Sequence, residues 1–410
     1  MKIWWLLTAL VGLYLAAASQ SLWPDEAISA NVAKNNSYLG IVSNFSKYDF
    51  HPPGYYLILK TWADIFGYSE VSLRIPSTIF TLITVFIVYK LGGIEAAMIV
   101  GFNPLIVYYS HETRMYALVT MLLTTSVFFL IRKEYLYSGL AAGLSFWVFY
   151  GSIFLTMGIG LYLLVNKRYK PLFQFSLGPI LGILVISPLL FGQMKYSKEI
   201  LGTVTNWSLV LGKANIKNLL LIPMKFTGGR ISFYPKVVYY AIVGIWSAYV
   251  FSKLFKKNVY SFLFWASIAL GTIFSIFTPM LQYFRFLYTI PLMGLAINKN
   301  KLIVAGSLLF SLVYISFPTF HREDWKTLSV NLPNKVYMIE SFGDPLRYYK
   351  PNIEIIDIRK KPTESIITVI PYGEIIHGVD HQKILTEQGY RLVSRSVFRE
   401  LVSETWHIGT

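Results

Sequence analysis

The sequence predicts a polytopic α-helical membrane protein with a small extracytoplasmic α/β domain at its C-terminal end. Of its 410 residues, 54% are hydrophobic and only 14% are charged, and the mean hydropathy is +0.50. A soluble globular protein is less apolar and more charged than this. Long apolar segments fill residues 1–317, whereas residues 318–410 mix charges with short alternating runs. We therefore expect a transmembrane domain over 1–317 and a separate α/β domain over 318–410.

The apolar part divides into segments that are long enough to cross a membrane. A transmembrane helix needs about 20 largely apolar residues, because each residue adds about 1.5 Å toward a hydrocarbon core of about 30 Å. On this measure we expect about eleven transmembrane helices. They lie near residues 3–19, 71–91, 94–109, 115–131, 135–150, 152–165, 172–191, 234–252, 258–277, 284–297 and 301–317.

The distribution of basic residues predicts the orientation in the membrane. Residues 1–317 hold 25 Lys and Arg against 9 Asp and Glu, which accounts for the whole net charge of +16. Short basic loops stay on the cytoplasmic side, and the basic pairs fall in alternate loops, so we expect a cytoplasmic N-terminus. The long external connection 192–233 is also basic, but long loops translocate largely regardless of charge. This pattern indicates a membrane protein and no nucleic-acid partner.

The C-terminal region has the pattern of strands that alternate with helices. Runs at 335–340, 352–358, 365–372 and 390–398 read as strands, and 324–332, 344–349 and 380–388 read as helices, each opened by an aspartate. Aspartate caps helix N-termini by accepting from backbone N–H groups. No glycine-rich phosphate loop or other catalytic motif occurs here, so we expect a structural or acceptor-facing role.

Cysteine is absent, which excludes a disulfide framework, a thiolate zinc site and a cysteine nucleophile. The remaining candidates for chemistry are charged residues in the external connections. The first is the adjacent pair Asp25 and Glu26, which follows Trp23 and Pro24 at the membrane boundary. One reading is a helix start, with Pro24 in the first turn and the carboxylates favoured by the helix dipole. The other reading is a catalytic carboxylate held at that helix start.

Further along, KYDFHPPGYYLILKTWADIFG (47–67) joins a fixed turn to an aromatic, amphipathic stretch. Such a stretch suits the plane of the membrane interface. His51 and Lys60 are candidates for contact with a phosphate, and a turn with interfacial aromatic residues is the alternative.

Arg74 and Arg285 each lie at the outer end of an expected span. An arginine there either extends its charge to the lipid headgroups or binds a lipid phosphate. Between two other spans, the turn NPLIVYYSHETRMYAL (103–118) brings together His111, Arg114 and Tyr116 with Glu112. Ionisable residues at membrane depth are costly and usually functional. The HExxR spacing lacks the second histidine of a zinc protease, because Met115 stands there.

Taken in order, these motifs resemble the GT-C class of membrane glycosyltransferases. The motifs are the Asp-Glu pair after the first span, HPPGYY, LRIPS, YYSHETRMYAL, QYFRF before a late span, and EDWKTL at the start of the external domain. The sequence is similar to the prokaryotic branch related to protein O-mannosyltransferases and to the lipid A aminoarabinose transferase. The resemblance covers most of residues 20–130 and, more weakly, 278–330.

This resemblance implies a GT-C fold and a polyprenyl- or dolichyl-phosphate-linked sugar donor. It implies a hexosyl- or pentosyltransferase whose base is an acidic residue in the first external loop, here Asp25 with Glu26 as its partner. The acceptor hydroxyl would belong to a glycan, a lipid or a protein. The sequence departs from some relatives at His51, where they carry lysine, and it lacks the WWD-type motif of oligosaccharyltransferases.

The residue types suit this chemistry. A carboxylate removes a proton from the acceptor hydroxyl, and cationic side chains stabilise the departing phosphate. We therefore expect in-line displacement with inversion on the extracytoplasmic face. The candidate contacts to the lipid phosphate are His51, Lys60, Arg74, His111, Arg114, Tyr116 and Arg285. No metal ligand set is expected, and a divalent cation on Asp25 or Glu26 is the alternative.

Two readings from other classes compete with an enzyme. A secondary transporter also has many spans and a few intramembrane charges, but it usually shows internal repeats and broken helices near the midplane. The sequence shows no repeat, and its ionisable residues gather toward one face. The third reading is a non-catalytic component of surface-polysaccharide assembly.

Overall fold

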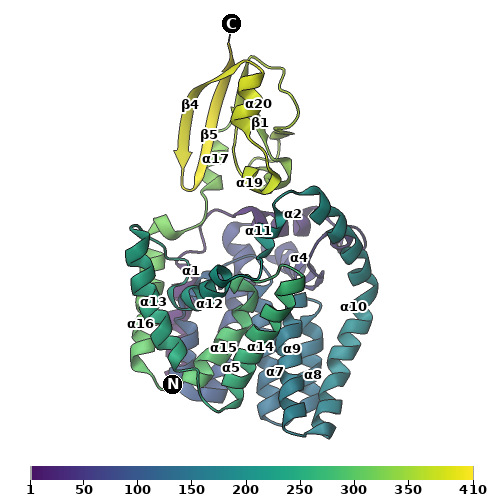
Figure 1. Cartoon of the computed structure of the whole chain (residues 1–410), viewed down its shortest axis with the longest axis vertical. Coiled ribbons are helices and arrows are strands. Elements are labelled where there is room, and N and C mark those ends of the chain that lie inside the picture. Colours follow the sequence, from purple (N-terminus) through teal and green to yellow (C-terminus); the bar gives the residue numbers. More distant parts are fainter. Residues whose placement is uncertain (1, 410) are drawn as a thin grey trace.

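The computed structural model describes residues 2–409, apart from the side chains of 198, 200–203, 208 and 209. A bundle of helices forms the larger part, and a small sheet domain sits on one end of it (Figure 1). The N-terminus lies toward the opposite end of the bundle. The molecule therefore has one end that carries the sheet domain and one end that carries the start of the chain.

The bundle helices follow the apolar segments of the sequence. Their bounds are α1 (Lys2–Leu15), α5 (Glu70–Gly101), α6 (Pro104–Tyr109), α7 (Tyr116–Ile131), α8 (Tyr135–Ser145), α9 (Ile153–Val165), α10 (Tyr169–Thr203), α13 (Lys236–Ser252), α14 (Val259–Phe277), α15 (Ile290–Ile297) and α16 (Lys301–Ser316). A 3-10 turn, η4 (Tyr283–Thr289), leads into α15.

Three of the described helices are long and apolar enough to cross a membrane, namely Glu70–Gly101, Tyr169–Ser197 and Val259–Phe277. Most of the other bundle helices are shorter apolar helices. These helices support a membrane location, and the number of about eleven spans stays a prediction. Helix α5 joins two expected segments, 71–91 and part of 94–109, through a break at Gly93, where φ is 79°. Glycine adopts that left-handed conformation without a steric penalty.

Four glycines allow helices α8 and α10 to approach each other closely. A Cβ atom on Gly139 would lie 2.0 Å from the carbonyl oxygen of Phe175, and one on Gly178 would lie 2.1 Å from the backbone of Gly139. Gly143 and Gly182 face the same interface, since a Cβ on Gly182 would meet the Gly143 carbonyl oxygen at 2.5 Å. This spacing of small residues four apart lets helix backbones approach closely inside a membrane.

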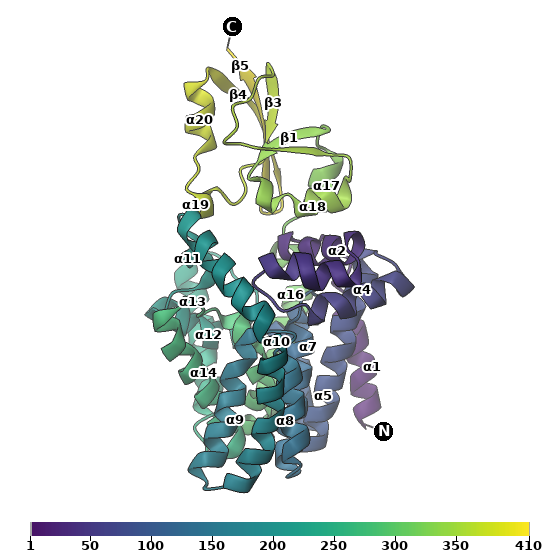
Figure 2. The ribbon, with the colours of Figure 1, turned by 90° about the vertical axis from the view of Figure 1, so that its right-hand side faces the viewer.

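A layer of short helices covers the end of the bundle that faces the sheet domain, and α2 and α4 lie across it (Figure 2). The layer consists of α2 (Pro24–Asn35), α3 (Tyr38–Gly40), η1 (Ile41–Phe45), η2 (Ser46–Tyr48), α4 (Gly54–Phe66), α11 (Trp207–Leu211) and α12 (Ile216–Gly228). Helix α4 buries Tyr55, Tyr56 and Leu59 and exposes Ile65 and Phe66. It is the expected amphipathic helix.

The C-terminal domain contains one mixed five-stranded sheet with the order β2-β1-β3-β5-β4. Its strands are β1 (Lys335–Met338), β2 (Glu354–Asp357), β3 (Ile366–Val369), β4 (Tyr390–Phe398) and β5 (Leu401–Ile408). Strand β1 pairs in parallel with β2 and β3, and β5 pairs antiparallel with β3 and β4. The helices of this region are α17 (Trp325–Val330), α18 (Asp344–Tyr349), α19 (Glu374–His377) and α20 (His381–Glu387).

The expected strands and helices of this region are confirmed, but β5 and α19 were missed. Asp324 accepts from the Thr327 N–H at 3.1 Å, and Asp380 accepts from the Lys383 N–H at 3.1 Å, as expected of capping residues. The expectation is wrong for Asp344, which lies inside the first turn of α18 after Gly343 at the N-cap and makes no capping hydrogen bond. Strand β5 was not predicted, because the buried Glu404 interrupts its alternation of apolar and polar residues. The Glu404 carboxylate pairs with His381 at 2.8 Å.

The sheet domain is tied to the start of α2. Asn31 donates to the Asp344 carboxylate at 3.0 Å. The Leu22 N–H donates to the Tyr349 hydroxyl at 2.8 Å, and that hydroxyl donates to Glu70 at 2.6 Å. Helix α18 therefore helps to fix the connection that carries the adjacent carboxylates Asp25 and Glu26.

The glycine contact between α8 and α10 gives a stability prediction. We expect Gly178→Val to destabilise the protein by about 1–3 kcal/mol, the usual penalty for overpacking a close contact. Thermal unfolding in detergent measures the loss. Gly244→Val is the matched control, because no atom lies within 4 Å of a Cβ at Gly244. Equal melting temperatures for the two variants would contradict the close contact.

Candidate functional site

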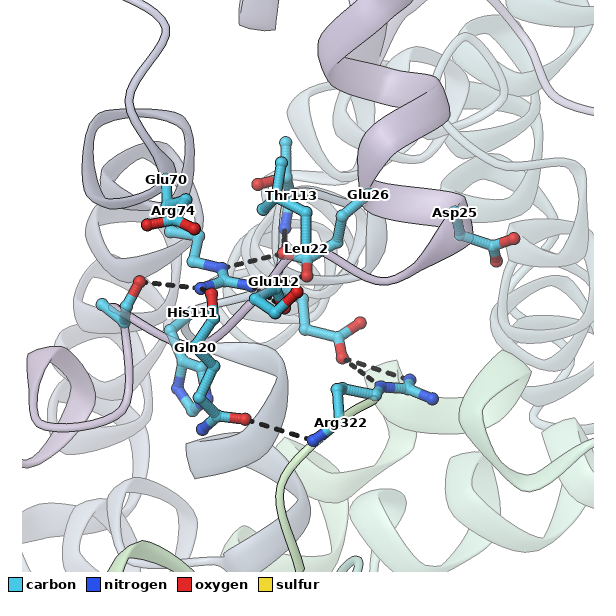
Figure 3. Close-up of polar contacts among 12 residues, drawn as sticks. Gln20, Leu22, Asp25, Glu26, Glu70, Arg74, His111, Glu112, Thr113 and Arg322 are labelled. Carbon is cyan, nitrogen blue, oxygen red and sulfur yellow. Dashed lines mark hydrogen bonds and ion pairs between the residues drawn. The ribbon is translucent and has the colours of Figure 1, made fainter. Parts of the chain in front are cut away.

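The adjacent carboxylates of α2 point in different directions. Helix α2 begins with Pro24 in its first turn, after an extended Trp23. Successive residues of an α-helix are rotated by about 100°, because there are 3.6 residues per turn. As a result Glu26 is fully buried, whereas the side chain of Asp25 is 40% exposed. Figure 3 shows the Asp25 carboxylate turned away from the group around Glu26.

Glu26 forms a buried ion pair with Arg74. The Arg74 Nε donates to Glu26 Oε1 at 2.9 Å, and Nη2 donates to Oε2 at 2.6 Å. The backbone N–H of Thr113 also donates to Glu26 Oε1 at 2.8 Å. Two-point pairing of this kind fixes geometry as well as charge. Glu26 therefore anchors the start of α2 to α5 and to the turn before α7.

Arg74 has no donor left for a phosphate in this arrangement. Its other N–H groups donate to the carbonyl oxygens of Ala18 at 2.7 Å, Gln20 at 2.5 Å and Ser21 at 3.2 Å. The side chain is buried, so it does not extend toward lipid headgroups. The alternatives considered from the sequence, headgroup anchoring or a lipid phosphate, do not describe the observed contacts.

The turn between α6 and α7 is buried over 110–116. His111 points toward α16, where its Nε2 lies 3.2 Å from the Tyr314 hydroxyl. Gln20 donates to the same hydroxyl at 3.2 Å. His111 thus belongs to a structural network beside α16, and the structure does not bring it together with Asp25.

Glu112 pairs with Arg322, which lies in the segment that leads to the sheet domain (Figure 3). Arg322 donates to Glu112 Oε1 from Nη2 at 3.2 Å and from Nε at 3.3 Å. Its guanidinium lies 3.6 Å from the centre of the Trp23 ring and 4.9 Å from that of Tyr108. Burial raises the pKa of the Glu112 carboxyl, although Arg322 opposes that shift.

Arg114 faces Asp25. Its Nη2 lies 3.7 Å from Asp25 Oδ2, and Nη1 donates to the Asp25 carbonyl oxygen at 3.3 Å and to the Ser29 hydroxyl at 3.4 Å. Its Nε is buried and has no partner among the described residues. The ion pair is longer than a close charge-assisted hydrogen bond of about 2.7–2.9 Å. A ligand can therefore take up part of the bonding capacity of both groups.

Arg285 and Tyr116 complete this side of the site. Arg285 lies in η4, where its backbone N–H donates to the Gln282 carbonyl oxygen at 3.1 Å, and its side chain makes no hydrogen bond or ion pair with any described residue. It lies within electrostatic range of Asp25 and Tyr116. The Tyr116 ring packs against Phe149 and Phe284, with ring centres 5.9 Å and 5.5 Å away. The structure thus brings Asp25, Arg114, Tyr116 and Arg285 into one cluster, which we call the outer cluster.

A second carboxylate, Asp49, lies near the outer cluster. It accepts from the Tyr56 hydroxyl at 2.8 Å, and its Oδ1 lies 3.5 Å from His51 Nδ1. Burial favours a higher pKa for Asp49, but His51, Tyr56 and the more distant Arg114 together hold the pKa below its usual value. Asp49 is therefore charged at neutral pH and orients His51 from one side.

The partners of Lys60 lie outside the outer cluster. Its Nζ lies 3.1 Å from Asp64 Oδ2, donates to the Ala33 carbonyl oxygen at 3.2 Å, and sits 5.3 Å from the centre of the Tyr38 ring. These contacts hold α4 against α2. The structure does not bring Lys60 to the outer cluster.

Asp49, Tyr56 and Arg322 were not predicted from the sequence as site residues. Asp49 and Tyr56 flank the His-Pro-Pro turn, and a carboxylate two residues before that turn was a usable signal. Arg322 gave no local signal, because its partner Glu112 is 210 residues away in the chain. Among the described residues, no group of three His, Asp or Glu side chains is placed to hold a metal ion.

A sequence family described as dolichyl-phosphate-mannose-protein mannosyltransferase matches residues 50–191, about a third of the chain. The match supports a GT-C membrane glycosyltransferase. The resemblance predicted from the sequence motifs is thereby confirmed, and residues 50–191 include His51, Arg74 and the turn with Arg114. No curated protein sequence matches the chain.

Several solved structures align with most of the chain. Two are structures of ArnT from Cupriavidus metallidurans, in the apo state and bound to undecaprenyl phosphate. Each is 12% identical and covers 97% of this chain and 96% of its own, with TM-scores of 0.49 and 0.46. The third is arabinosyltransferase EmbB from Mycobacterium smegmatis, which is 13% identical and covers 80% of this chain and 32% of its own, with a TM-score of 0.40.

The two adjacent carboxylates should differ in their effect on stability. We expect Glu26→Gln to lower the free energy of unfolding by about 3–5 kcal/mol, because it leaves Arg74 buried beside a neutral partner. Asp25→Asn should change it by less than about 1 kcal/mol, since exposed ion pairs contribute little. Thermal unfolding in detergent measures both variants. Equal losses of stability would contradict the separate roles of the two carboxylates.

Proposed function

We propose that the protein transfers a sugar from a polyprenyl- or dolichyl-phosphate-linked donor to an acceptor hydroxyl on the extracytoplasmic face, with inversion at the anomeric carbon. Asp25 acts as the base. The observation that carries this proposal is the arrangement of the adjacent carboxylates. Glu26 is closed off by Arg74, whereas the Asp25 carboxylate is accessible and faces Arg114 at 3.7 Å.

The reaction follows from that arrangement. Asp25 takes the proton from the acceptor hydroxyl, and the acceptor oxygen forms a bond to the anomeric carbon. The bond between that carbon and the phosphate oxygen breaks at the same time, and the phosphate leaves with the electron pair. A single displacement from the opposite side inverts the anomeric configuration. A positioned base of this kind accelerates proton transfer by about 10²–10⁴-fold.

The departing phosphate gains negative charge, which cationic groups must stabilise. We assign this role to Arg114 and Arg285, because both lie near Asp25 and both have bonding capacity that described residues do not use. Arginine suits a phosphate because its planar guanidinium can form two parallel hydrogen bonds. Tyr116 belongs to the same cluster, and His51 lies 3.5 Å from Asp49. Two cations beside a single phosphate supply the charge that the reaction needs.

Three earlier candidates are left out of this phosphate site. Arg74 is saturated by Glu26 and backbone carbonyl oxygens. Lys60 is engaged by Asp64, and His111 faces Tyr314. These residues hold the helices that position the outer cluster, so their substitution should act through stability.

Two findings support the orientation and the donor. Helix α2, which carries Asp25, lies at the end of the bundle that carries the sheet domain, and the N-terminus lies toward the other end (Figure 2). The turns between α7 and α8 and between α9 and α10 lie at that other end (Figure 2). They hold the basic pairs Arg132–Lys133 and Lys167–Arg168, which suits a cytoplasmic side. The description of the matching family names a dolichyl-phosphate sugar, which suits a lipid-phosphate donor here.

Substitution of the proposed base tests the reaction. We expect Asp25→Asn to lower transfer from a radiolabelled polyprenyl-phosphate sugar by at least about 10²-fold, because the amide cannot accept the proton. Its affinity for undecaprenyl phosphate should stay within about twofold of the unmodified protein. Asp64→Asn is the control, since that carboxylate pairs with Lys60 away from the outer cluster. Near-normal turnover by Asp25→Asn would refute the assignment.

Substitution of the arginines tests the phosphate site. We expect Arg114→Gln and Arg285→Gln each to weaken binding of undecaprenyl phosphate by about 10- to 100-fold, the usual loss for a hydrogen bond to a charged group. Binding is measured in nanodiscs with the purified protein. Lys60→Gln should bind as the unmodified protein does. An equal loss in all three variants would show that general charge, and not these two arginines, controls binding.

A further inference from the structure

A second group of cations lies around the end of α12 and shares no residue with the outer cluster. Lys225 occupies the last turn of α12, Arg230 follows that helix, and Lys236 begins α13. Their positive charges lie close enough that Arg230 and Lys236 both act on Lys225. Neither Lys225 nor Lys236 forms an ion pair with a described residue, and Arg230 reaches only Glu400, at 3.4 Å.

Backbone contacts at the end of α12 fix the position of Arg230. Gly229 has a φ of 62°, and a Cβ atom there would lie 2.8 Å from Pro104, so the loop after α12 packs directly on α6. Asn103 donates to the Phe226 carbonyl oxygen at 2.7 Å and fixes the end of α12. Arg230 consequently lies over Tyr108, with its guanidinium 5.6 Å from the ring centre.

The polar atoms around Arg230 are not all satisfied. The Nε of Arg230 is buried and has no hydrogen-bond partner among the described residues. The Tyr108 hydroxyl and Glu323 Oε2 are also buried without a partner. A buried donor without a partner costs free energy comparable to a lost hydrogen bond. The neighbouring cations Arg230 and Lys236 add a further cost, because they disfavour the charge of Lys225. An anion placed among Lys225, Arg230 and Lys236 would remove both costs.

We propose that Lys225, Arg230 and Lys236 form a second anion-binding site, which holds a phosphate group of the acceptor substrate. The assignment to the acceptor rests on the proposed function, in which the donor phosphate lies beside Asp25 on Arg114 and Arg285. An anion held by Lys225, Arg230 and Lys236 would then belong to another part of the acceptor. Glu400, from the turn between β4 and β5, borders it from the sheet domain.

Lys225 gives this site a characteristic pH dependence. Burial, together with Arg230 and Lys236, lowers the pKa of Lys225 to about 8. Lys225 is therefore charged below that pH and loses its charge above it. The charged groups that act on it are the cations Arg230 and Lys236. Phosphate binding should weaken as the pH rises through about 8, and Lys225→Arg should remove that dependence.

The test uses inorganic phosphate as the probe, with the full chain in phosphatidylcholine nanodiscs that are saturated with undecaprenyl phosphate. We expect inorganic phosphate to bind the unmodified protein under these conditions. Lys225→Gln combined with Arg230→Gln should weaken that binding by about 10- to 100-fold, as expected for lost charge-assisted hydrogen bonds. The same variant should bind undecaprenyl phosphate normally. Lys217→Gln, an exposed position on the same helix, is the matched control.

The outcomes separate the competing explanations. Competition between inorganic phosphate and undecaprenyl phosphate would make the cluster part of the donor site and overturn the proposal. Loss of phosphate binding in phosphatidylglycerol nanodiscs alone would make it a site for bulk lipid headgroups and would also overturn it. If the double variant misfolds, Lys225→Arg still decides, since unchanged pH dependence in that variant contradicts the proposal. None of these readouts needs turnover, so failure of Asp25 as a base would be seen separately.

Discussion

The buried pair between Glu26 and Arg74 is the interaction on which the site depends. It joins the start of α2 to α5, and Thr113 adds the turn before α7 to the same carboxylate. A buried ion pair with every donor satisfied contributes little net stability but is costly to break. Here it fixes the helix start so that the neighbouring residue, Asp25, must project in another direction. The division of roles between two adjacent carboxylates follows from that constraint.

The turn between α6 and α7 connects this ion pair to Asp25 and to the sheet domain. Thr113 holds Glu26, and Arg114 faces Asp25, so the anchor and the proposed base are both controlled by neighbouring residues of one turn. Glu112 extends the network to Arg322, which belongs to the connection with the sheet domain. The sheet domain is also tied to Leu22 through Tyr349. Movement of the sheet domain would therefore change the positions of the side chains in the outer cluster.

Much of this could be predicted from the sequence, because it depends on local patterns. Apolar length predicts the bundle helices, aspartate caps predict α17 and α20, and the Pro-Asp-Glu run predicts the start of α2. The charged residues of the external connections were recognised as candidates for the same reason. Their partners could not be predicted, because those contacts join distant parts of the chain. Arg74 pairs with a residue 48 positions away, and Arg322 with one 210 positions away. The glycine contact between α8 and α10 was missed because each glycine looks unremarkable within its own apolar run.

In the proposed reaction, Asp25 and the two arginines face the donor phosphate while Glu26 stays paired with Arg74. A cryo-electron microscopy structure of the protein in nanodiscs with bound undecaprenyl phosphate measures this directly. The account predicts a phosphate within hydrogen-bonding distance of Arg114 and Arg285, with the Asp25 carboxylate beside it and the Glu26–Arg74 pair unchanged. A phosphate bound to Arg74 with Glu26 displaced, or bound at the opposite end of the bundle, would contradict it.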